Sequence, residues 1–140
     1  MSEPLYTTEI LRLAASLDEP QALDREDGRA ELRSPTCGSR ISLTVQLDRE
    51  RRVERLSMRI SACAFGQASA ALLARYSRGR NHDDVSQAMV TLSRWLAEDR
   101  AEAVDWPGIA ALAPARAKRG RHAAILLPFR ALLAAIEAAG

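Results

Sequence analysis

The sequence predicts an α+β domain, in which a three-stranded antiparallel sheet is covered by helices in the order α-βββ-αααα. Two patterns lead to this prediction. Between residues 29 and 60, three segments alternate apolar and polar side chains, a period of two that is typical of strands with one covered and one solvated face. Before and after this region, apolar side chains recur at helical spacing instead. A small sheet with one apolar face needs helices laid across it, so we expect both patterns to belong to one fold.

The chain of 140 residues is expected to form one domain, spanning 1–140, that is large enough to bury a single core. Its 47% apolar and 27% charged residues are typical of a folded globular protein. The net charge of +2 is too small to indicate nucleic acid, and a broad basic face with stacking aromatics is not visible. No apolar run reaches membrane-spanning length and the N-terminus does not resemble a secretion signal, so we expect a cytoplasmic protein without a membrane partner.

The first expected element is a helix. The segment Thr7-Thr8-Glu9 offers a cap, and apolar side chains follow at helical spacing at Ile10, Leu11, Leu13, Ala14 and Leu17. Residues 18–28 are acidic and include Pro20 and Gly28, which predicts a loop.

Three strands should follow this loop. Residues 29–34 alternate, residues 41–48 give the strictest alternation of the chain, and residues 53–60 alternate again after a charged turn. Alternation on all three strands implies an antiparallel meander, because strands of a buried parallel sheet are apolar on both faces.

Helices are expected to make up the remainder of the chain. The second spans 63–78, and Asp83 or Asp84 caps the third. A short helical turn opens at Trp106, and Pro128 is expected in the first turn of the last helix, where a proline is tolerated. The apolar stripes of these helices comprise Ala68, Leu72 and Tyr76, then Val85, Met89, Leu92 and Leu96, and finally Leu126, Phe129, Leu133 and Ile136.

Both cysteines lie where regular structure should break. Pro35 and Gly38 predict a turn that exposes the thiol of Cys37. Cys63 lies between the last strand and the second helix, so it should be close to a helix N-terminus, where free N–H groups and the helix dipole favour a thiolate. If the two turns meet at one end of the sheet, two sulfur atoms converge there.

These segments resemble the motifs of the IscU/NifU/SufU family of iron–sulfur cluster scaffolds. Ser-Pro-Thr-Cys-Gly-Ser at 34–39 resembles the Asn-Pro-x-Cys-Gly-Asp turn of that family. Residues 62–70 resemble its second motif, Gly-Cys-Ala-x-Ser-x-Ala-Ser. Residues 121–132 resemble the third motif, which places a cysteine before Leu-Ala-x-x-Ala-Leu at the start of the last helix. The long stretch between the second and third motifs is similar to the SufU branch.

The chain departs from these motifs at two ligand positions. The third cysteine position is Ala124, or Ala123 if His122 matches the histidine that precedes the cysteine in IscU-type members. Ser39 stands where the family has an aspartate, and its neutral hydroxyl is a poor metal ligand.

The resemblance implies a scaffold or sulfur-acceptor protein and not an enzyme. Such a protein takes persulfide sulfur from a cysteine desulfurase and holds zinc, iron or a nascent iron–sulfur cluster. The candidate ligands here are Cys37, Cys63 and His122, which leave one coordination position open. The alternative is a degenerate, metal-free family member that binds a desulfurase or another assembly protein and modulates it. Both cysteines could also be small buried residues without a role in chemistry.

Other interpretations have less support. A Cys–His hydrolase could use Cys63 and His122, but no third residue is available to orient them, and Gly-rich phosphate loops and serine nucleophile motifs are absent from the sequence. A basic group precedes the last helix and either docks an acidic partner, lowers the pKa of a neighbouring thiol, or is a solvated loop at the helix end that disfavours positive charge. Its members are Arg116, Lys118, Arg119 and Arg121. The oligomeric state is left open.

Overall fold

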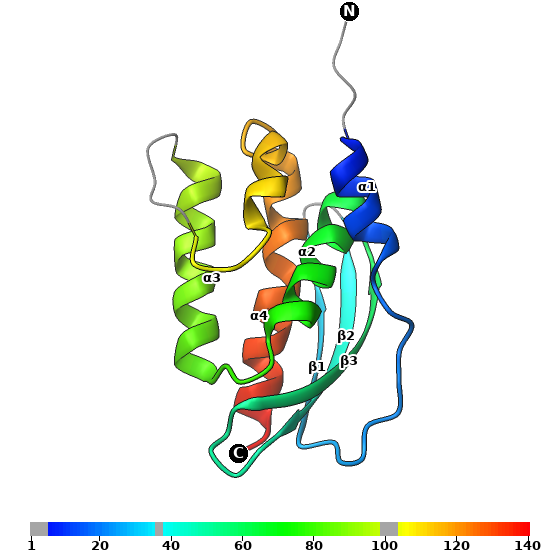
Figure 1. The fold of residues 1–140 in the computed structure, drawn as a ribbon, viewed down its shortest axis with the longest axis vertical. Coiled ribbons are helices and arrows are strands. Elements are labelled where there is room, and N and C mark those ends of the chain that lie inside the picture. The colour runs from blue at the N-terminus through cyan, green and yellow to red at the C-terminus, as the bar shows by residue number, and fades with distance from the viewer. Residues whose placement is uncertain (1–5, 36–37, 99–103) are drawn as a thin grey trace, which may run out of the picture.

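The computed structural model describes residues 6–35, 38–98 and 104–140 (Figure 1). One helix precedes three strands, and further helices follow them, so the predicted α+β order is confirmed. The elements are α1 (Thr8–Ala15), β1 (Gly28–Arg33), β2 (Arg40–Leu47), β3 (Val53–Ser61), α2 (Ala64–Tyr76), α3 (His82–Ala97), the 3-10 segments η1 (Ile109–Ala115) and η2 (Arg119–Arg121), and α4 (His122–Ala138). The predicted short helical turn before the last helix corresponds to η1.

The sheet has the order β1-β2-β3, with β2 in the centre and antiparallel to both neighbours. Leu32, Ile41 and Ile60 are direct cross-strand partners, which puts the apolar residues of all three strands on one face. α4 packs on β1 and β2 across this face, α2 lies beside α4 and β3, and α3 packs on α4 away from the sheet (Figure 1). None of the helices in the described part of the chain has the length and hydrophobicity needed to cross a bilayer.

Gly28 is the point of closest approach between β1 and α4. The sequence places Gly28 in the preceding loop, but it is the first residue of β1, paired with Val45. A Cβ atom added at Gly28 would lie only 1.9 Å from the carbonyl oxygen of Ala135 in α4. Glycine is therefore required here because the backbone of α4 occupies the space that a side chain would need.

The predicted position of Pro128 is wrong. Pro128 lies in the interior of α4 and not in its first turn. Since proline has no N–H group, the carbonyl of Ala124 loses its helical partner. The helix nevertheless continues, because apolar residues before the proline are buried, including Ile125 and Leu127. The hydroxyl of Ser69 in α2 also donates a hydrogen bond of 2.6 Å to the carbonyl of Ile125, which ties α2 to this part of α4.

The loop between α1 and β1 covers part of the other face of the sheet. The N–H of Gln21 donates to the hydroxyl of Ser57 in β3 at 2.8 Å. The N–H of Arg25 donates to the side-chain oxygen of Gln46 in β2 at 3.2 Å. These contacts lie toward the β2–β3 turn, so the loop shields that half of the outer face, whereas the half at the other end of the strands is not covered by these contacts.

Candidate functional site

Cys63 occupies the N-cap position of α2, which confirms the prediction that it precedes a helix. Its backbone is extended, with φ −67° and ψ 172°, and its side chain makes no capping hydrogen bond. β3 ends at Ser61, so only two residues separate the strand from the helix. Cys63 is a free cysteine in the described part of the chain, and it is half-buried. Cys63 is thus held on a short connection between two regular elements, beside the free N–H groups of the first turn of α2.

Tyr6 also belongs to this site, although no sequence pattern indicated it. Its ring packs edge-on against Phe65 in the first turn of α2, with 5.0 Å between ring centroids. Burial raises the pKa of the Tyr6 hydroxyl, and the neighbouring Cys63 raises it further, while the positive charge of Arg121 acts in the opposite direction. The residues ahead of α1, the start of α2 and the start of α4 therefore meet at one place. No local sequence signal indicated this contact, because Tyr6 lies ahead of Thr7, the N-cap of α1.

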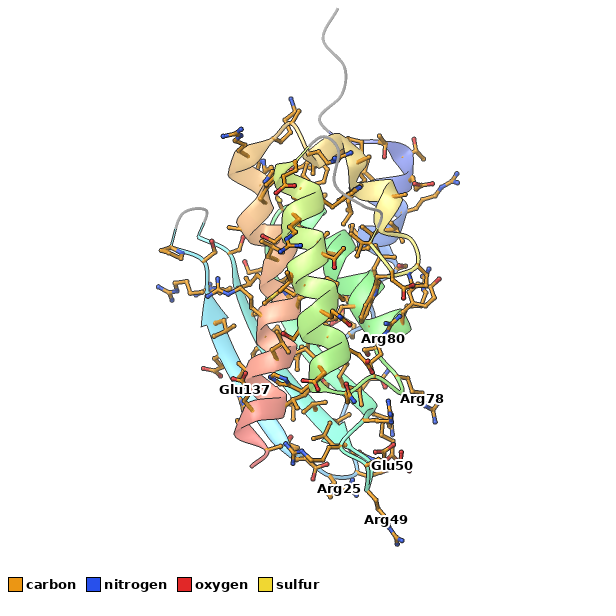
Figure 2. All side chains as sticks on the ribbon, turned by 90° about the vertical axis from the view of Figure 1, so that its left-hand side faces the viewer. Arg25, Arg49, Glu50, Arg78, Arg80 and Glu137 are labelled. Carbon is orange, nitrogen blue, oxygen red and sulfur yellow. The ribbon has the colours of Figure 1, made fainter. Side chains whose placement is uncertain are left out.

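His122 is the first residue of α4 and is half-buried. Its Nε2 atom lies 2.9 Å from the carbonyl oxygen of Ala115 and 3.1 Å from that of Arg116. Because carbonyl oxygens only accept hydrogen bonds, Nε2 must carry the proton and donate it. In the neutral imidazole, Nδ1 is then the nitrogen with a free lone pair. Histidines that bind a metal commonly donate the other ring N–H to a carbonyl oxygen in this way. The other histidine, His82, lies 2.9 Å from Glu137, at the opposite end of α4 (Figure 2).

Ala124 of α4 lies against Gly66 of α2, and Gly66 is about one helical turn after Cys63. A Cβ atom added at Gly66 would lie 3.3 Å from the Cβ of Ala124 and 3.2 Å from its carbonyl oxygen. Ala124 is buried at this contact, whereas Ala123 is half-buried. Of the two alternatives for the missing cysteine, Ala124 is therefore the one whose side chain lies at the α2–α4 contact.

The described residues on either side of the first cysteine motif lie at the ends of β1 and β2. The N–H of Ser34 donates to the carbonyl of Ser39 at 2.7 Å, and Gly38 has a left-handed φ of 73°. Ser39 is buried. Cys37 lies outside the described residues, so its predicted proximity to Cys63 stays a prediction. Within the described residues, no group of three His, Cys, Asp or Glu side chains could hold a metal ion.

Solved structures with a similar fold are known, although matches by sequence were not found. The chain matches no protein-family model and no curated protein. It is similar to the structure of an N-terminal, nitrogen-fixing NifU-like protein from Brucella abortus, with a TM-score of 0.85, 27% identity, and coverage of 95% of this chain and 92% of that one. The chain has a NifU-like fold. The resemblance to the IscU/NifU/SufU family is thereby confirmed.

A second structure with this NifU-like fold comes from Fervidobacterium islandicum and is assigned as an iron–sulfur cluster assembly scaffold protein for the SUF system. It has a TM-score of 0.79 and 16% identity, and the match covers 94% of this chain and 96% of that one. A third, a hypothetical protein, has a TM-score of 0.67 and 25% identity over 92% of this chain and 96% of the other. At 16% identity, the Fervidobacterium match supports the fold alone.

The basic group of this NifU-like chain divides into two kinds of residue. Arg116 is bound within the protein, since its Nε donates to the carbonyl of Trp95 at 2.7 Å and its guanidinium lies 4.9 Å from the Trp95 ring centroid. Lys118 and Arg119 are exposed, and Arg121 is half-buried near Tyr6. The docking of an acidic partner by this basic group therefore stays a prediction. Lys118 and Arg119 are the members whose exposure suits that role. The charged side chains of the β2–β3 turn lie at the end of the molecule away from the start of α4 (Figure 2).

Proposed function

We propose that this protein is an iron–sulfur cluster assembly scaffold that receives sulfur from a cysteine desulfurase at Cys63. One observation carries the proposal. In a fold shared with a NifU-like protein and a SUF-system scaffold, the free, half-buried Cys63 lies at the N-terminus of α2 and next to the start of α4.

The chemistry is a thiol–persulfide exchange. The thiolate of Cys63 attacks the terminal sulfur of a persulfide on the desulfurase. A new S–S bond forms at Cys63, the S–S bond of the desulfurase persulfide breaks, and its cysteine leaves as a thiolate. No external oxidant or reductant is consumed, because the sulfane sulfur only changes its partner. The free N–H groups at the start of α2 stabilise the negative charge that the new persulfide carries.

The metal or cluster is the cargo of such a scaffold. Cys63, His122 and Cys37 are the residues proposed to hold it, with Nδ1 of His122 as the nitrogen donor. Three donors leave one position open for substrate sulfur, water or a partner's ligand. The alternative, a metal-free member that modulates a desulfurase, is favoured by a specific observation: the two remaining ligand positions are occupied by Ala124 and Ser39, both buried and neither a good metal donor.

Sulfur transfer tests the proposal directly. The chain is incubated with a cysteine desulfurase and L-cysteine, and the persulfide is located by peptide mass spectrometry after alkylation. We expect labelled Cys63 in the wild type and in Cys37→Ser, and loss of the label in Cys63→Ser. Ser93→Ala, a change at an exposed position of α3, is the matched control and should be labelled as the wild type. A persulfide found only on Cys37, or on neither residue, would contradict the role of Cys63.

A further inference from the structure

The face of the sheet that the helices leave open carries a groove of about 560 Å³. Its polar lining residues alternate along the strands with Leu32, Ile41 and Ile60, whose side chains face the helices, so the groove lies on the face opposite α2 and α4. It occupies the half of this face that the contacts of the α1–β1 loop leave uncovered. The polar side chains that line it are Glu31, Arg33, Arg40, Ser42, Arg59 and Ser61.

The strand register explains both the hollow shape and the charge of this groove. Arg33 at the end of β1 is directly across from Arg40 at the start of β2. Arg59 on β3 is directly across from Ser42 on the central strand. The short Ser42 side chain forms the floor, and long arginine side chains stand on both edge strands. Three arginines therefore line one hollow, together with Glu31, which is directly across from Ser42 on β1 and is paired with Arg29.

These three arginines differ from the other arginines of the sheet. Arg29 pairs with Glu31 at 2.9 Å, and Arg55 pairs with Asp24 at 3.9 Å. Across the described ranges 6–35, 38–98 and 104–140, Arg33, Arg40 and Arg59 make no ion pair or side-chain hydrogen bond, and all three are exposed. Like charges directly opposite on neighbouring strands cost about 0.2–1 kcal/mol. An occupant with negative charge would turn this repulsion into attraction.

We propose that the groove is a docking surface for an extended, acidic segment of a partner protein. Carboxylates match the fork of an arginine guanidinium and form paired, charge-assisted hydrogen bonds with it. A single strand of nucleic acid fits less well, because none of the residues that line the groove is aromatic and bases would find no ring to stack on. Since Ser61 is two residues from Cys63, a docked segment lies at the end of the sheet where Cys63 is found.

Binding of a defined probe tests this proposal. The probe is a fluorescein-labelled peptide of eight residues that alternates Glu and Val, and its binding to the full chain is followed by fluorescence anisotropy at low salt, where surface charges are least screened. We expect saturable binding that Arg33→Gln with Arg59→Gln weakens by at least about tenfold. Ser42→Glu, which puts a carboxylate on the floor, should also abolish binding. The matched control, Arg94→Gln with Arg130→Gln, removes the same charge from exposed helix positions and should stay within about twofold.

Three results would overturn the proposal. Equal weakening in both double variants would mean that the peptide senses only the net charge. Tighter binding of a single-stranded oligonucleotide of the same charge, dependent on Arg33 and Arg59, would assign the groove to nucleic acid. Absence of saturable peptide binding would remove the docking site altogether. Cys63→Ser is expected to bind the peptide as the wild type does, so failure of docking and failure of sulfur transfer are distinguishable.

Discussion

Gly28→Ala is expected to lower the free energy of unfolding by about 3 kcal/mol or more, because it forces backbone apart in the core. The added Cβ would lie 1.9 Å from the carbonyl oxygen of Ala135 and 3.1 Å from the N atom of Ala139. Neither atom belongs to a flexible side chain, so α4 as a whole must move away from β1. Urea denaturation followed by circular dichroism measures the effect.

Gly120→Ala is the matched control for this prediction. A Cβ atom at Gly120 would have no heavy atom within 4 Å, so its effect should stay within about 0.5 kcal/mol. If Gly28→Ala unfolds at the same denaturant concentration as the wild type, α4 does not pack on β1 as described. The description of the site would then be wrong as well, since the position of His122 at the start of α4 depends on that packing.

Ala124→Cys combined with Ser39→Asp is expected to tighten zinc binding by about tenfold to a hundredfold. The physical reason is that an added thiolate closes the open coordination position, and metal binding then adds to folding stability. Without metal, Ala124→Cys should cost about 1–3 kcal/mol, because Ala124 is buried at 1% exposure against Gly66. Competition with a chromophoric chelator gives the affinity, and thermal unfolding with and without zinc gives the stability.

Ala123→Cys with Ser39→Asp is the control for geometry. Successive residues of a helix point about 100° apart, so a thiol at the half-buried Ala123 should not reach the same metal. An equal gain in both variants would trace the tighter binding to Ser39→Asp, which they share, and not to a thiolate at residue 124. If neither variant gains affinity, the site has lost more than a ligand, and the role of a metal-free modulator replaces that of a scaffold.

Much of the fold could be predicted because its signals are local. The alternation of β2 and of its two neighbours reflects one buried and one solvated face, and helical spacing on both sides of the strands indicated the covering helices. Cys63 was placed at a helix N-terminus because a change of period from two to helical spacing marks that boundary. Pro128 was misplaced because a rule for isolated helices was applied to a helix whose apolar residues are buried on several sides.

The parts of the site that could not be predicted depend on contacts between distant segments. Tyr6 precedes the first helix, and only the packing of α1 beside α2 brings it to Cys63 and Phe65. The arginine groove has the same origin. Arg33, Arg40 and Arg59 are ordinary exposed positions in three alternating strands, and only the register shows that they surround Ser42.

The metal and sulfide content of the protein, purified without oxygen, tests the central claim most directly. Zinc, iron and acid-labile sulfide are measured per chain for the wild type, Cys63→Ser and Cys37→Ser, and circular dichroism checks that each variant is folded. A scaffold predicts near-stoichiometric metal in the wild type and a clear loss of metal in both variants. Metal-free wild-type protein of full thermal stability, indifferent to both substitutions, would contradict the scaffold function and leave the modulator in its place.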